Sequence, residues 1–198
     1  MLAATVYTYA YYLFEAALSD AILLHVAVFS SALFALILGL SAVEVESLAE
    51  RFSPKTPRRW IAGFLAVLAV SLGGLWLSAA AQFALTDRVP AGSALVETDS
   101  LVKLGIALDL SLLVPGYAIA AVLLWRRHGW GYVLAAVLLT SGVAHQIGYM
   151  VALPFQVAAD VPGATAFDPV EPVIATGFLL AAVTLLASAR RPQPRQGR

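Results

Sequence analysis

Long apolar runs separated by short polar stretches dominate this sequence, and they predict membrane-spanning helices. Each run is close to the ~20 residues that a helix needs to cross ~30 Å of hydrocarbon at 1.5 Å per residue. Because lipid offers the backbone no hydrogen-bond partners, helix is the expected conformation, and the alternating pattern of a membrane barrel is absent. Five spans are clear: residues 21–43, 60–84, 104–125, 130–153 and 172–189.

The N-terminal run of residues 2–18 is a sixth candidate span. It is short and rich in tyrosine, and Glu15 interrupts it near its end. We expect it to cross the membrane, either as a complete short span or as the outer half of a span cut by a start codon assigned too late. An interfacial segment is the alternative. The predicted fold class is therefore all-α: one polytopic transmembrane bundle over residues 1–198, with five spans or six.

The basic residues predict the orientation of this bundle. Ten of the twelve Lys and Arg residues lie in alternate connections, whereas the connections between them are acidic. Positive charge marks the cytoplasmic side of a membrane protein, so we expect a cytoplasmic C-terminus. Gly129 is expected to supply the bend of the tight turn "RRHGWGY". The residues expected to determine topology are Arg58, Arg59, Arg126, Arg127, Arg190 and Arg191.

Composition supports the lipid bilayer as the main partner. The chain is 61% hydrophobic and 12% charged, whereas soluble domains are about a quarter charged. Net charge is zero, with no basic patch of the kind that nucleic acid requires. There is no cysteine, which excludes disulfides, thiolate metal sites and cysteine nucleophiles.

Several polar side chains lie inside the apolar runs, in the part predicted to face outside. An ionisable group in a membrane helix costs about 2.5–3.5 kcal/mol on insertion scales, so each one needs a reason. Helical spacing places them on stripes with small residues, which mark helix contacts in lipid. We therefore expect them to point into the bundle and to converge toward its outer mouth. The candidate pocket residues are Asp109, His145, Gln146, His25, Gln82 and Tyr149.

Three interpretations of these residues stay open. They could only hydrogen-bond across helices and fix the packing. They could line an outward-facing pocket for a small ligand, an ion or a proton, since a buried aspartate beside a histidine suits proton handling. Otherwise His25 and His145 could be the axial ligands of a b-type haem. No other cofactor or metal is predicted. Pro115 breaks the ladder of its helix, either as a static bend or as a gating kink.

One stretch resembles a family of uncharacterised prokaryotic multi-pass membrane proteins. In that family an Asp-Leu pair precedes a helix proline, a Leu-Trp-Arg-Arg turn and a Trp-Gly-Tyr triplet. The matching residues here are Asp109-Leu110, Pro115, Leu124-Trp125-Arg126-Arg127 and Trp130-Gly131-Tyr132. The preceding span is similar too, but family members carry Asn and Tyr at Asp20 and His25, which weakens any shared role for His25. The resemblance covers about two thirds of the chain. It implies the fold and a prokaryotic cytoplasmic membrane, and it supplies no activity.

The predicted function is correspondingly general. The sequence contains no metalloprotease motif, serine-hydrolase motif or phosphate-binding loop, so no catalytic residue is assigned. We expect a membrane protein that binds, senses or transports a small ligand or proton, with Asp109 as its key residue and His145 as partner. The alternative is a structural or accessory subunit whose polar residues only pack helices.

Overall fold

The computed structural model describes residues 1–14, 20–53, 55–88 and 93–189, and this part of the chain forms helices and no strand. A π-helical turn, η1 (Asp109–Leu113), joins α5 to α6 in one continuous helical segment, Asp99–Trp125. The other helical elements are α1 (Leu2–Phe14), α2 (Ile22–Ser41), α3 (Val45–Glu50), α4 (Arg58–Thr86), α5 (Asp99–Leu108), α6 (Val114–Trp125), α7 (Gly129–Ala158) and α8 (Glu171–Ala187).

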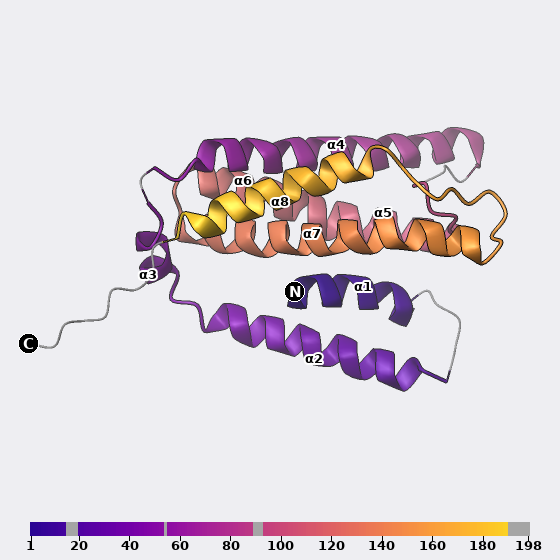
Figure 1. The fold of residues 1–198 in the computed structure, drawn as a ribbon, viewed down its shortest axis with the longest axis horizontal. Coiled ribbons are helices and arrows are strands. Elements are labelled where there is room, and N and C mark those ends of the chain that lie inside the picture. Colours follow the sequence, from indigo (N-terminus) through magenta and orange to yellow (C-terminus); the bar gives the residue numbers. More distant parts are fainter. Residues whose placement is uncertain (15–19, 54, 89–92, 190–198) are drawn as a thin grey trace, which may run out of the picture.

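Helices α4, α6, α7 and α8 pack side by side and enclose the main core (Figure 1). The largest fully buried side chains come from these four helices: Ile61, Leu65, Leu124, Leu139, Leu153 and Leu185. Helices α1 and α2 form a hairpin that is joined to the core through contacts of α1 with α7. Helix α2 lies at the edge of the bundle and buries only Ala32.

Four helical segments are long and apolar enough to cross a membrane: Ile22–Ser41, Arg58–Thr86, Asp99–Trp125 and Gly129–Ala158. They coincide with the first four predicted spans, which confirms those as long apolar helices. The fifth predicted span corresponds to α8, which has 17 residues and is about 25 Å long at 1.5 Å per residue. Length alone therefore identifies four spans and does not establish the fifth.

Helix α1 occupies most of the predicted N-terminal run, whose residues 15–18 lie outside the described part. It has 13 residues and is about 20 Å long, which is short of the hydrocarbon thickness. Its first residue lies part-way along the bundle rather than at either end (Figure 1). Helix α1 runs beside α2 and α7, so it is a short helix packed within the bundle.

The outer faces of the helices are strongly apolar. Many large apolar side chains are more than half exposed, whereas soluble monomers expose few such side chains together. Lipid is the environment in which such a surface is stable, so the apolar helices indicate a membrane protein. Clear examples are Leu23, Phe34, Val70, Leu77, Leu85 and Val173.

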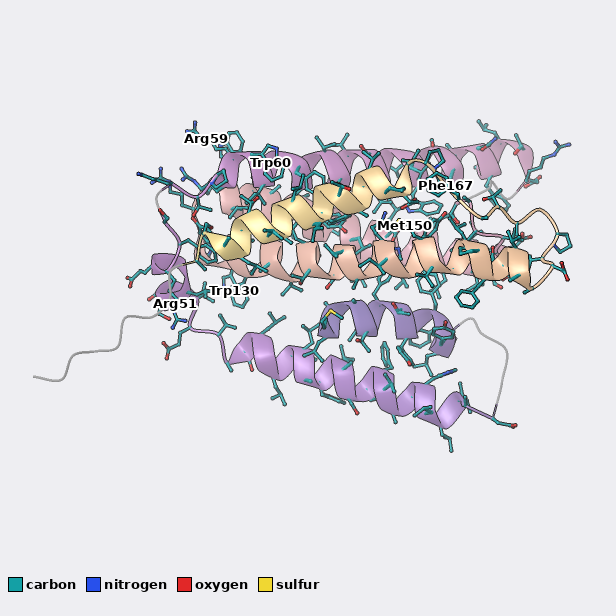
Figure 2. All side chains as sticks on the ribbon, in the orientation of Figure 1. Arg51, Arg59, Trp60, Trp130, Met150 and Phe167 are labelled. Atoms are coloured by element: carbon teal, nitrogen blue, oxygen red, sulfur yellow. The ribbon has the colours of Figure 1, made fainter. Side chains whose placement is uncertain are left out.

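The basic connections share one end of the bundle. Arg51 and Arg59 lie there together with Trp60 and Trp130, whereas Phe167 lies toward the opposite end (Figure 2). The guanidinium of Arg59 lies 5.8 Å from the ring centroid of Trp125, within cation–π range. The predicted topology residues Arg190 and Arg191 lie outside the described residues.

The tight turn between α6 and α7 is made differently from the prediction. Arg127, not Gly129, takes the left-handed conformation that reverses the chain, with a φ of 62°. Gly129 instead begins α7, and it must lack a side chain because a Cβ there would lie 2.4 Å from a methyl group of Val45 and 2.7 Å from its carbonyl oxygen. Its role is close approach to α3, which the sequence pattern could not distinguish from a bend.

Candidate functional site: a carboxylate beside a central cavity

Asp109 is the centre of a buried polar cluster. Its side chain is 7% exposed, and both carboxylate oxygens accept hydrogen bonds from neutral donors. One oxygen accepts from the hydroxyl of Tyr7 on α1, and the other from the indole N–H of Trp76 on α4 at 2.7 Å. The hydroxyl of Tyr11 lies 3.1 Å from that of Tyr7. The carboxylate therefore ties together three elements that are far apart in the sequence.

Asp109 is the first residue of the π-helical turn η1, and Pro115 explains why the turn is there. A proline has no N–H, and its ring clashes with the carbonyl four residues earlier, here that of Ser111. The helix responds by widening, and the N–H of Val114 donates to the carbonyl of Asp109, five residues back. The break in the ladder expected at Pro115 thus takes the form of a π-turn, which sets the position of the carboxylate.

Leu112, which lies inside the π-turn, is 58% exposed but lines the cavity together with Asp109. Beyond the turn the buried positions include Tyr117 and Ala120.

Helix α7 supplies the opposite wall of the cluster. The His145 ring meets the Tyr7 ring edge to face, with centroids 5.5 Å apart and an interplanar angle of 88°. The amide of Gln146, which is 8% exposed, donates a hydrogen bond to the carboxylate of Glu171. The hydroxyl of Tyr149 accepts from the backbone N–H of Ala94 at 2.8 Å.

A cavity of about 750 Å³ lies beside this cluster, between the α1–α2 hairpin and helices α4, α6, α7 and α8. Its volume falls within the range of ligand sites, and most of its walls are apolar. No Lys or Arg lines it among the residues that the structure describes. The main polar and aromatic groups on its wall are Tyr7, Trp76, Asp109, Ser141, His145, Gln146, Tyr149 and Glu171.

The structure brings four of the six predicted pocket residues to this cavity: Asp109, His145, Gln146 and Tyr149. Gln82 is exposed on α4 and does not line the cavity, so the prediction that it points into the bundle is wrong. The buried face of α4 passes through Gly73, Trp76 and Ala79, whereas Gly74 and Gln82 are exposed.

His25 is half-buried against α1, away from the cavity wall. Its ring lies 5.8 Å from that of Tyr9 and 5.2 Å from that of Tyr12, whereas His145 contacts Tyr7. Residues two positions apart on a helix point to different faces, so α1 separates the two histidines. This arrangement lends no support to a shared haem. Among the described residues, no group of three or more His, Asp or Glu side chains is placed to hold a metal ion.

The cluster also lies deeper along the helices than expected. The helical segment that contains Asp109 begins at Asp99, and α7 continues past Pro154 to Ala158. The sequence pattern had placed both of these helix ends in loops. Asp109 is therefore about 15 Å along the axis from the start of its helical segment, and His145 is about 20 Å from the end of α7. Both sit near the middle of their helices.

Sequence reasoning missed three contributors to the cavity wall: Tyr7, Trp76 and Glu171. The tyrosine-rich N-terminal run was a signal, since tyrosine in a membrane helix carries a hydroxyl that needs a partner. Trp76 gives no such signal within an apolar run, because a tryptophan there equally suits contact with lipid.

The chain matches no protein-family model, no curated protein and no solved structure. The resemblance of its Asp-Leu, Pro and Leu-Trp-Arg-Arg pattern to prokaryotic multi-pass proteins therefore stays a prediction.

Proposed function

We propose that this protein is a multi-pass protein of the prokaryotic cytoplasmic membrane that binds a small ligand in its central cavity, in a sensing or transport role. In this proposal α8 is the fifth span, α1 is a short sixth helix within the bundle, and the cavity faces the outer side. The gathering of arginine-bearing turns at one end of the bundle supports a cytoplasmic C-terminus.

One observation carries the proposal: a buried carboxylate borders an open space whose described lining holds no Lys or Arg. Asp109 is nearly inaccessible, yet among the described residues its hydrogen bonds come from a phenol and an indole. Ionisable groups at membrane depth are expensive and face bundle interiors or cavities, where they mark substrate or proton pathways. A cavity of about 750 Å³ leaves room for the group that would complete the site.

A structural role is the second candidate, and one observation favours it. The two hydrogen bonds of Asp109 join α1 and α4 to η1, which is what a packing residue would do. In that case the polar residues would stabilise an accessory subunit and the cavity would bind nothing.

Chemical labelling distinguishes the two candidates. Dicyclohexylcarbodiimide is a lipophilic reagent that attaches to carboxyl groups in apolar surroundings. With the protein in membranes, we expect mass spectrometry to find an adduct on Asp109 and none in Asp109→Asn. A water-soluble carbodiimide is expected to modify the exposed Asp99 and to spare Asp109. Failure of the lipophilic reagent to reach Asp109 would favour the structural role.

A further inference from the structure

The charges on the cavity wall restrict the kind of ligand that fits. Two carboxylates, those of Asp109 and Glu171, line the cavity, and no Lys or Arg does so among the described residues. An anionic ligand would add a third negative charge where apolar walls screen poorly. With the imidazole of His145 neutral, as a hydrogen-bond acceptor must be, a neutral ligand would leave the carboxylate of Asp109 without an opposite charge. A ligand that carries a positive charge would supply the missing one.

The aromatic groups around Asp109 point to the same conclusion. Aromatic faces attract cations, and ammonium groups are commonly recognised by clusters of such rings. The rings of Tyr7, Trp76, Tyr117 and Phe178 all line the cavity. The bond from its indole N–H to Asp109 holds Trp76 beside the carboxylate.

A buried hydroxyl on α7 has no partner among the described residues. The Oγ atom of Ser141 is buried without a hydrogen bond, whereas its neighbour Thr140 donates to the carbonyl of Ala136 at 2.7 Å. Ser141 lines the cavity one helical turn from His145, on the same face of α7. Ser141, His145 and Asp109 therefore line one cavity and carry acceptor atoms suited to a ligand that donates several hydrogen bonds.

The remaining wall suits an apolar body. Five leucines also line the cavity: Leu33 and Leu36 of α2, Leu68 and Leu72 of α4, and Leu138 of α7. Burial of alkyl or aromatic groups against such side chains is favourable in proportion to the apolar area covered.

We infer that the cavity binds a lipophilic primary amine. Its protonated nitrogen lies against Asp109, Ser141 and His145, and its apolar body lies along the leucine side chains. This inference rests on the proposed function and names the ligand class of the same site.

The test compares three probes that share one alkyl chain and differ only in the head group: decylamine, decanol and decanoate. The full-length protein is placed in lipid nanodiscs with Trp60, Trp125 and Trp130 replaced by phenylalanine, so that fluorescence reports on Trp76 alone. We expect a saturable change with decylamine, binding weaker by about tenfold or more with decanol, and none with decanoate. Asp109→Asn should weaken decylamine binding about tenfold, and the matched variant Asp99→Asn should not change it.

The outcomes distinguish the amine inference from the proposed ligand pocket. Equal affinity for decylamine and decanol, or binding indifferent to Asp109→Asn, would overturn the amine inference and leave the pocket intact. No saturable response to any of the three probes would overturn the pocket as well. Ser141→Ala provides a second variant if Asp109→Asn fails to fold, because the lost hydroxyl holds no hydrogen bond in the protein. It should weaken decylamine about threefold to tenfold and leave decanol unchanged.

Discussion

Replacing Asp109 by asparagine separates the charge of this side chain from its hydrogen bonds. The amide oxygen can still accept from the indole N–H of Trp76, and the amide N–H can donate to the Tyr7 hydroxyl, whose own proton then turns toward Tyr11. Alanine, by contrast, removes both contacts and leaves the Trp76 N–H buried without a partner.

The expected magnitudes differ enough to measure. A neutral hydrogen bond is weaker than a charge-assisted one by about 1 kcal/mol, so the two bonds of Asp109 lose about 2 kcal/mol in the asparagine variant. Removing the charge returns about 2.5–3.5 kcal/mol on insertion scales. The two terms leave Asp109→Asn with a net gain of at most about 0.5–1.5 kcal/mol, because the asparagine amide is itself polar. Asp109→Ala should cost about 1–3 kcal/mol, because the indole N–H stays unpaired.

Unfolding of the micelle-bound protein by sodium dodecyl sulfate, followed by circular dichroism, measures these differences. Asp99→Asn is the control, because it removes one exposed carboxylate from the same continuous helical segment. If Asp109→Asn were as destabilising as Asp109→Ala, the charge itself would stabilise the fold. The reasoning that the site awaits a cation would then be refuted.

Four further predictions test other parts of the structure. Reporter fusions after Arg127 and near Asp160 should report opposite compartments, and matching signals would refute the orientation. Burial raises the pKa of the Glu97 carboxyl, against the hydrogen bond from a serine hydroxyl that lowers it. The folded state therefore holds this proton at a pH where the unfolded chain has lost it. The free energy of unfolding should fall as pH rises above the usual glutamate range, and Glu97→Gln should reduce this pH dependence. Gly131→Ala should destabilise the protein by roughly 1–3 kcal/mol or more in the same assay, because its Cβ would lie 2.3 Å from the backbone of α6. The control Gly148→Ala meets open space and should stabilise the protein by about 0.5–1 kcal/mol. An absorption spectrum of overexpressing membranes should show no Soret band, and such a band would instead favour haem.

The sequence predicted the elements better than their contacts. Runs of apolar residues identify helices because membrane depth imposes both length and composition, and four of the predicted spans are long apolar helices. Four of the predicted pocket residues line the cavity: Asp109, His145, Gln146 and Tyr149. They could be predicted because polar side chains are rare enough in apolar helices to stand out.

The predictions that were wrong concerned which side of a helix faces the bundle. Small residues mark close approach, but α4 carries adjacent glycines, and the buried one is Gly73 rather than Gly74. Neighbouring residues differ by about 100° around a helix. Because Gly73 and not Gly74 faces the bundle, Gln82 lies on the outer face. The entry of Tyr7 into the site depends on the tertiary placement of α1: its hydroxyl indicates the need for a partner but does not identify Asp109 as that partner. The fifth span, the orientation and the ligand stay predictions.

The surplus residue in η1 has an evolutionary consequence. A homologue that lacked both Pro115 and one position between Asp109 and Leu113 would regain an unbroken α-helix and would rotate its preceding segment by about 100°. A different side chain would then face the cavity while hydropathy and length stayed almost the same. Single-residue gaps at this point in an alignment should therefore mark a change of ligand, even between sequences that are otherwise close.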